Sequence, residues 1–334
     1  MRDKKFVHLF VLTLFGIIAI VIITNYIVDP LFTFKHIKEV NINYKDVNER
    51  LQKTNYLKYV DNNFDALLLG NSRVSYINTN DFNIGYKIFN YSINALSPLE
   101  YETIIDHFIF LTGKNPKIIL IGIDLFSLTM KTYSEEFEQI FKNQNDPLYR
   151  YKNLVSFDTF LLSVKNIFST IQLHYGVYDR KQRFYNRSLE KGSTIKNAIS
   201  NKEYIELGNW GFSFSHDLIM NTLQALKTKY KHSQFIIFTP PIHSFLLKNW
   251  SQNDLFLQTH YKALENLVDI FGEVHHFLYF DPIFADNTNF YDVFHFYPYI
   301  GSLIANHISN EIKTENVGIL LNKNNIHPYL NKLP

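Results

Sequence analysis

The longest apolar segment of the chain lies close to its beginning. Residues 6–28 contain no Lys, Arg, Asp or Glu, whereas Arg2, Lys4 and Lys5 precede them. A helix of about 23 residues, at about 1.5 Å per residue, is long enough to cross the roughly 30 Å apolar core of a bilayer. Basic residues before such a span favour a cytoplasmic N-terminus. The pattern therefore predicts a cytoplasmic tail at 1–5, a transmembrane anchor at 6–28 and a chain that continues outside the cytoplasm.

The boundary of this segment favours an anchor that is retained. A cleaved signal peptide has a shorter apolar core and a small-residue cleavage site, and neither is present. Asn25 and Tyr26, followed by Asp29-Pro30, instead read as an interfacial boundary. The alternative, a buried helix of a soluble domain, is disfavoured by the length. His8 is expected to be an interface residue near the cytoplasmic end.

After the anchor the hydrophobic pattern becomes periodic. Residues 29–62 are polar, with helical spacing of apolar positions at 46–60, and read as a stalk or covering helix. Short apolar runs then alternate with helical patterns. Strands are expected at 65–70, 86–92, 117–124, 233–241 and 275–281, and helices at 97–113, 156–172, 215–230, 253–272 and 298–312.

This alternation predicts an α/β domain at 63–312, with a mostly parallel sheet and helices on both faces. Residues 131–212 are less regular and are interpreted as an insertion that could wall a substrate site. The segment 313–334 is polar, and we expect a peripheral C-terminal tail.

Composition narrows the functional classes. The net charge of +2 gives no basic field, so no nucleic-acid partner is expected. Cysteine is absent, which excludes disulfides and thiolate metal sites. Neither a glycine-rich phosphate loop nor a His-Glu-x-x-His motif occurs, so we expect no metal and no other cofactor.

Polar residues follow four of the expected strands, where the reactive groups of open α/β sheets gather. The clusters lie at 70–73, 90–97, 122–124 and 290–298. A serine nucleophile needs an imidazole as base and a carboxylate to orient that imidazole. Ser72 lies in the first cluster, and Asp292 and His295, three apart, lie in the last. Taken alone, Ser72 would be a turn residue and Asp292 a helix cap; together they predict a triad in the chain order Ser, Asp, His.

These motifs carry a family resemblance. The serine after the first strand and the Asp-x-x-His before the last helix resemble the SGNH (GDSL-like) hydrolase superfamily. The single anchor, "VDP", "LLLGNSRV", "FNYSINALSP" and "IILIGIDLF" resemble its membrane-anchored members associated with modification of bacterial cell-surface polysaccharides. The resemblance covers most of residues 60–312. It implies a three-layer α/β/α fold, Ser72 as nucleophile, His295 as general base and Asp292 as its partner.

Two blocks depart from the family pattern. The second block of the family offers a glycine whose backbone N–H binds the oxyanion, where this chain has Ser92, Asn94 or Ala95. A backbone N–H survives that change, so Asn94 or Ala95 could still donate. The third block usually supplies an asparagine, where this chain has Asp124. An ionised carboxylate repels an oxyanion, and one lost donor can cost about 10²- to 10³-fold in rate.

Charge pairing suggests another use for Asp124. Arg73 directly follows the nucleophile, and Asp124 ends what should be the neighbouring strand. Because buried charges are usually paired, we expect an ion pair that braces the serine turn. The alternative is that Arg73 or Asn71 faces the substrate.

The remaining aromatic and histidine candidates have two readings each. His243, beyond a strand end, is a candidate pocket residue or a surface or core histidine. Trp210 is a candidate platform for stacking a sugar or a core residue. His275 and His276 begin a strand at the opposite edge of the sheet, where in-and-out alternation explains them without a metal.

The sequence thus predicts a single-pass protein of the bacterial cytoplasmic membrane with an extracytoplasmic, periplasmic domain. The expected activity is that of a serine esterase or O-acyltransferase moving an acetyl-sized group on a cell-envelope carbohydrate. For a transferase, a membrane protein that delivers the acyl group is an expected partner. The alternative is an inactive glycan-binding or assembly protein of the same fold. Asp124 and the missing glycine of the second block are the reasons for retaining this alternative.

Overall fold

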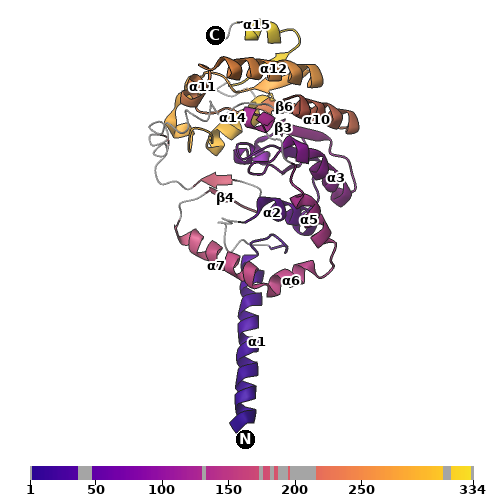
Figure 1. Cartoon of the computed structure of the whole chain (residues 1–334), viewed down its shortest axis with the longest axis vertical. Coiled ribbons are helices and arrows are strands. Elements are labelled where there is room, and N and C mark those ends of the chain that lie inside the picture. The colour runs from indigo at the N-terminus through magenta and orange to yellow at the C-terminus, as the bar shows by residue number, and fades with distance from the viewer. Residues whose placement is uncertain are drawn as a thin grey trace. The chain divides into compact units, whose positions relative to one another are not determined.

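A computed structural model describes residues 2–36, 47–129, 133–172, 176–180, 184–186, 195, 216–310 and 317–331. The chain divides into two compact units (Figure 1). Unit 1 comprises Met1–Asn62 and Glu135–Lys181, and unit 2 comprises Asn63–Ser134 and Gln182–Pro334. The first part of the expected insertion therefore groups with the N-terminal helix.

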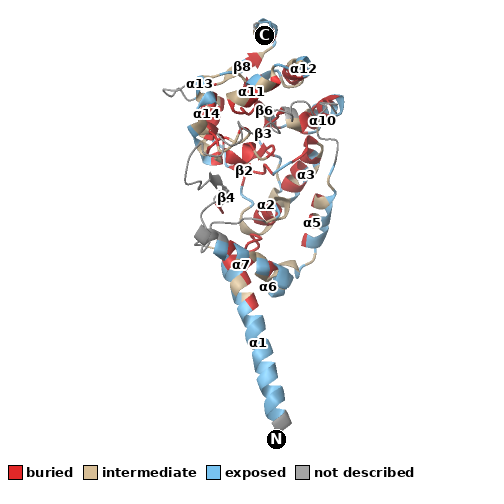
Figure 2. Cartoon of the chain, turned by 60° about the vertical axis from the view of Figure 1, so that its left-hand side comes forward, coloured by how far each residue is buried: buried red, intermediate tan, exposed pale blue. Residues whose placement is uncertain are grey.

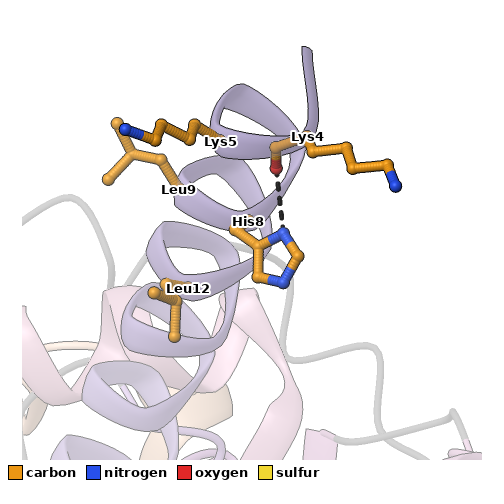
Figure 3. A pocket seen from close by; sticks show the side chains of 5 residues that line it. All are labelled: Lys4, Lys5, His8, Leu9 and Leu12. Carbon is orange, nitrogen blue, oxygen red and sulfur yellow. Dashed lines mark hydrogen bonds between the residues drawn. The ribbon is translucent and has the colours of Figure 1, made fainter. Parts of the chain in front are cut away.

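Unit 1 begins with the long helix α1 (Arg2–Val28), which is exposed along most of its length (Figure 2). Its segment Lys4–Val28 is long and apolar enough to cross a membrane, by length and composition. Near its beginning, a shallow hollow is lined by Lys4, Lys5, His8, Leu9 and Leu12 (Figure 3). The His8 ring lies 2.9 Å from the Lys4 carbonyl oxygen, so this hollow belongs to one face of a single helix.

A buried ion pair closes the turn after α1. Asp29 has a positive φ of 42° and accepts hydrogen bonds from the backbone N–H groups of Thr33 and Phe34, each at 2.9 Å. The Arg180 guanidinium donates to the Asp29 carboxylate at 2.6 Å, and both side chains are buried. This pair joins the two chain segments of unit 1.

Short helices make up the rest of unit 1. They are α2 (Glu49–Asn55), a π-helical continuation (Tyr56–Val60), α5 (Glu136–Gln144), α6 (Tyr149–Val155) and α7 (Phe157–Gln172), followed by strand β4 (Gly176–Tyr178). Asn48 caps α2 by accepting a bond from the Leu51 N–H. The helical patterns at 46–60 and 156–172 are therefore confirmed.

Unit 2 is built on a six-stranded sheet, as the alternation of strand and helix patterns predicts. The order is β2 (Ile88–Asn90), β1 (Ala66–Leu69), β3 (Ile118–Gly122), β6 (Gln234–Thr239), β7 (Glu273–His276) and β8 (Ile319–Asn322). The first five strands are parallel and β8 is antiparallel. β1 and β3 are buried along their whole length, as continuous apolar strands of a parallel sheet are.

Helices cover both faces of this sheet. The described helices of unit 2 are α3 (Tyr101–Thr112), α4 (Leu125–Thr129), α10 (His216–Lys229), α11 (Ser244–Trp250), α12 (Asp254–Phe271), α13 (Pro282–Ala285), α14 (Pro298–Ile308) and α15 (Ile326–Leu330); a short strand, β5 (Phe184–Asn186), also belongs to this unit. Leu68 and Leu120 share a core cluster with Ile300 and Ile304 of α14, whereas neighbouring strand residues alternate to the opposite face. Figure 2 shows α14 on one side of the strands and α3 and α10 on the other.

The C-terminal segment differs from the expected peripheral tail. The last parallel strand, β7, ends at His276 rather than at residue 281, and β8 pairs with it in the antiparallel direction. β7 is therefore an interior strand and not the sheet edge. Leu321 and Ile326 are buried, so part of 317–331 belongs to the core. The pattern ILLN is too short and too close to polar residues to stand out in the sequence.

The strand order creates a natural crevice. From β1 the chain moves to β2 on one side and then to β3 on the other side. Ligands of open α/β sheets bind at such a switch point, outside the carboxyl ends of the strands. The ends of β1 and β3 are therefore where a site is expected.

Candidate active site

The candidate nucleophile follows β1 in a tight turn. Gly70 leaves the strand, and the Val74 N–H donates to the Asn71 carbonyl at 3.0 Å. A Cβ atom on Gly70 would lie 2.3 Å from the Val74 Cγ2 methyl, and one on Gly122 would lie 2.4 Å from the same methyl. Both glycines therefore make room for Val74, which packs beneath the serine turn.

Ser72, His295 and Asp292 form a continuous hydrogen-bonded chain. The Ser72 Oγ atom lies 2.9 Å from His295 Nε2. On the far side of the ring, His295 Nδ1 lies 2.9 Å from Asp292 Oδ2 and 3.0 Å from Oδ1. A proton on Nδ1, held by Asp292, leaves Nε2 free to accept the proton of Ser72. The structure thus brings together the three residues that the sequence singled out.

Asp292 is held in its ionised form. Burial raises the pKa of Asp292, but the hydrogen bond and charge of the His295 ring outweigh it, together with the backbone N–H groups of Phe294 and His295. The resulting pKa lies below the ordinary value of 3.8. The two N–H groups donate to Asp292 Oδ1 at 2.7 and 2.8 Å.

The loop that carries Asp292 and His295 is fixed by backbone bonds. The Tyr291 N–H donates to the His295 carbonyl at 2.7 Å, and the His243 N–H donates to the Val293 carbonyl at 3.0 Å. His243 itself is buried, caps α11 through a 3.2 Å bond from the Phe245 N–H, and is not among the described residues that line the pocket. The interpretation of His243 as a core histidine agrees with this burial, and its backbone N–H supports the loop.

The expected ion pair between Arg73 and Asp124 is present. Arg73 Nε donates to Asp124 Oδ2 at 2.9 Å, and a second guanidinium nitrogen contacts the same oxygen. Asn71 donates to that oxygen too and accepts a 3.2 Å bond from the Arg73 N–H. The other oxygen, Oδ1, accepts a 2.8 Å bond from the Ser127 N–H. Arg73 and Asp124 are 4% and 5% exposed, so this network braces the turn from inside.

The loop after β2 brings Ala95 into the pocket that Ser72 lines. The ladder between β1 and β2 continues past the strands, because the Ile93 N–H donates to the Gly70 carbonyl at 3.0 Å. Ala95 has a positive φ of 53°, the backbone conformation that glycine adopts without strain. Within the described part of the chain, the backbone N–H groups of Ser72 and Ala95 have no hydrogen-bond partner. Both are therefore available to a bound oxyanion.

Ser92 and Asn94 differ in their placement. The Ser92 hydroxyl lies 3.0 Å from that of Ser75 and donates to the Asn90 side chain, so it is used within the fold. Asn94 is exposed and lines the pocket beside Ala95.

A small pocket of about 250 Å³ opens at Ser72 and His295. Its apolar walls are Phe126 and Phe294, whose ring centroids lie 5.5 Å apart, and Trp250 packs 5.5 Å behind Phe126. The sequence interpretation missed both phenylalanines. Phe126 lies two residues after Asp124 and Phe294 one residue before His295, so adjacency to the chemical residues was the available signal.

Two further expectations concern parts outside this pocket. Trp210 and its neighbours lie outside the described residues. All described residues that line the pocket belong to unit 2, and none comes from 135–181. Among the described residues, no cluster of three or more His, Asp or Glu side chains is arranged to hold a metal ion.

No family model matches the chain, and no curated protein matches it.

Proposed function

We propose that the chain is a membrane-anchored serine esterase or O-acyltransferase of the SGNH type, acting outside the cytoplasm. The observation that carries the proposal is the 2.9 Å contact between Ser72 Oγ and His295 Nε2, with Asp292 on the other ring nitrogen. The parallel sheet, with the serine turn after its first strand and Asp-x-x-His before α14, supports the SGNH assignment.

The reaction follows from the positions of the protons. His295 Nε2 takes the proton of Ser72 as Oγ bonds to the acyl carbon, and the carbonyl electrons move onto oxygen. When the tetrahedral centre collapses, the bond to the leaving alcohol breaks, and that oxygen receives the proton from His295. The acyl group then remains on Ser72. An acceptor hydroxyl attacks it while His295 removes the acceptor's proton. The bond between Ser72 Oγ and the acyl carbon then breaks, and His295 returns the proton to Oγ.

The oxyanion is stabilised by the backbone of the two loops. The N–H groups of Ser72 and Ala95 line the pocket and have no hydrogen-bond partner among the described residues, so both can donate to the oxyanion. In this scheme Asp124 needs no role as a donor, because both of its oxygens accept bonds within the turn. The departure from the family asparagine is thereby compatible with catalysis.

The pocket favours a small acyl group. Its volume of about 250 Å³ is below that of ordinary ligand pockets, which start near about 300 Å³, and its walls are aromatic. An acetyl-sized group suits such a space. A cell-envelope carbohydrate as the acyl carrier or acceptor rests on the anchor and the family resemblance. Water as acceptor gives an esterase, and a glycan hydroxyl gives a transferase supplied by a membrane acyl donor.

Labelling with a serine-reactive fluorophosphonate tests the proposal. The full-length wild type should label, Ser72→Ala should not, and Ser75→Ala is the matched control from the same turn. A wild type that neither labels nor cleaves small acyl esters would favour the second candidate, an inactive glycan-binding protein. That candidate is favoured by Asp124 at the family's asparagine position. Offering an acyl donor with and without an oligosaccharide acceptor separates transferase from esterase.

A further inference from the structure

Helix α7 has its polar side inside and its apolar side outside. Thr159, Ser163 and Asn166 are buried, although each is polar. Phe157, Leu161 and Phe168, on another face, are 62%, 46% and 62% exposed. A surface helix of a soluble domain normally shows the opposite arrangement, with its apolar stripe toward the core. The reversal indicates that the exposed face does not meet water.

The buried polar face of α7 is held by the end of α1. Ser163 Oγ donates to Asn25 Oδ1 at 3.1 Å. The Asn25 amide in turn donates to the carbonyls of Leu154 and Ser156 at 2.9 and 3.0 Å, where α6 passes into α7. Asn25 is buried, so these bonds fix the junction of α6 and α7 to the last turns of α1.

Helix α6 extends the apolar surface. Leu148, Tyr151 and Val155 are each more than half exposed, and their spacing places them on one stripe. These three residues together with Phe157, Leu161 and Phe168 are called the apolar collar. Both helices lie across the end of α1 (Figure 1). Large exposed apolar patches mark interaction surfaces, and the exposed apolar residues of these two helices are candidates for one.

The length of α1 sets the level of the collar in a membrane. A span of about 20 residues crosses the apolar core, and 20 residues counted from Phe6 end at Asn25. The fixed junction of α6 and α7 therefore lies at the outer boundary of the apolar core. Val21, one turn deeper, is also buried, whereas Ile23 and Ile27 remain exposed. The end of α1 that holds the collar thus also carries exposed apolar side chains.

We propose that the apolar collar is embedded in the outer-leaflet interface of the membrane, with phospholipid as its occupant. This rests on the membrane anchor of the proposed function. Amphipathic helices that lie in the interface bury their apolar face at the boundary between headgroups and acyl chains. Exposed Lys165 is placed to reach headgroups in this arrangement, as interfacial lysines do, whereas Lys152 pairs with Asp146. The collar and α1 then form one lipid-facing surface that limits tilting of unit 1.

The absence of cysteine permits a direct test on the full-length chain. Single cysteines replace Phe157, Leu161 or Phe168, each carries a nitroxide, and the protein is reconstituted into vesicles of phosphatidylethanolamine and phosphatidylglycerol. Accessibility to oxygen and to a water-soluble nickel complex is then measured. Phe15→Cys is the reference within the span, and Glu138→Cys, exposed on α5 of the same unit, is the reference in water.

Collar labels should resemble the Phe15 label, with an oxygen-to-nickel ratio several-fold above that of the Glu138 label. Collar labels that match Glu138 while Phe15 is lipid-exposed overturn the collar and leave the anchor intact. Protection from both reagents also overturns it, because a second copy or a protein partner then covers the surface. A Phe15 label that is open to nickel overturns anchor and collar together. Unchanged thermal unfolding confirms that each variant is folded.

Discussion

Arg73 Nε donates a 2.9 Å hydrogen bond to Asp124 Oδ2, and both side chains are buried beneath the serine turn. The guanidinium carbon also lies 5.0 Å from the centroid of the Phe126 ring, which lines the pocket. This pair links the residue after the candidate nucleophile, the end of the neighbouring strand and one wall of the pocket.

Replacing one member of this pair should destabilise unit 2. Asp124→Asn leaves the buried guanidinium without a countercharge, and losing one partner of a buried pair typically costs about 3–5 kcal/mol. Chemical unfolding of the full chain measures the loss. Asp65→Asn, which breaks a half-exposed pair with Lys114, is the control and should have a much smaller effect. An Asp124→Asn variant that labels faster would contradict the bracing role and indicate that an amide at position 124 donates to the oxyanion.

Asp292→Asn should slow fluorophosphonate labelling strongly while the fold persists. An amide at this position favours the wrong imidazole tautomer, an effect that in serine hydrolases reaches about 10⁴-fold. Since interactions with His295 lower the pKa of Asp292 below 3.8, the carboxylate stays ionised at neutral pH. Protonation of Asp292 should therefore limit labelling only below pH 3.8. The labelling rate of Asp292→Asn against wild type at neutral pH checks the first expectation; equal rates would remove Asp292 from the mechanism.

Two substitutions at Ala95 should change the stability of the protein in opposite directions. Ala95→Gly should stabilise the protein by about 1 kcal/mol, because glycine adopts a positive φ without the strain of a Cβ atom, and labelling should persist because the backbone N–H remains. Ala95→Val adds a branched side chain to the same conformation and should destabilise it. Thermal unfolding and labelling measured on both variants provide the check. Equal stability of the two would show that the loop relaxes away from the observed conformation.

Buried histidines should make the protein acid-sensitive. Burial lowers the pKa of His260 and of His275 to about 4, with His307 adding to the effect on His275, and it lowers the pKa of His276 well below its ordinary value. An unfolded histidine titrates near about 6.5. Between about pH 6.5 and pH 4 the unfolded chain therefore binds more protons, so the free energy of unfolding falls as the pH falls. At about pH 5 each such histidine costs about 2 kcal/mol.

The variant His260→Phe tests this expectation. Its ring packs between those of Phe256 and His276, with centroids 6.1 and 5.5 Å away, so phenylalanine fits the site in size. The dependence of unfolding on pH between 6.5 and 4 should become shallower. The same substitution by phenylalanine at exposed His232 is the control. An unchanged pH dependence in His260→Phe would mean that other groups control acid stability.

The strands and the triad geometry could be predicted because each depends on a strong local signal. β1 and β3 are uninterrupted apolar runs, and Ser72 and His295 each follow an expected strand. In a parallel sheet the carboxyl ends of strands share one edge, so their meeting follows from topology alone. The ion pair of Arg73 with Asp124 could be predicted on the same ground.

Other features depend on contacts that leave no local pattern. His243 supports the Asp292 loop through its backbone N–H, a role that any residue type except proline could fill. β8 is recognisable only by its pairing with β7, because four residues among polar neighbours give too little periodicity. The reversed faces of α7 look like an ordinary amphipathic helix in the sequence, which does not say which face is inside.

The Ser72 and His295 side chains that meet at 2.9 Å are separated by 223 positions in the chain. Bringing such distant segments together costs loop-closure entropy that only a nearly complete domain repays. A chain that ends before residue 292 carries the serine without its base. During synthesis, which starts from the N-terminus, Ser72 therefore emerges long before His295, and their contact can form only when the last parallel strand and α14 are in place.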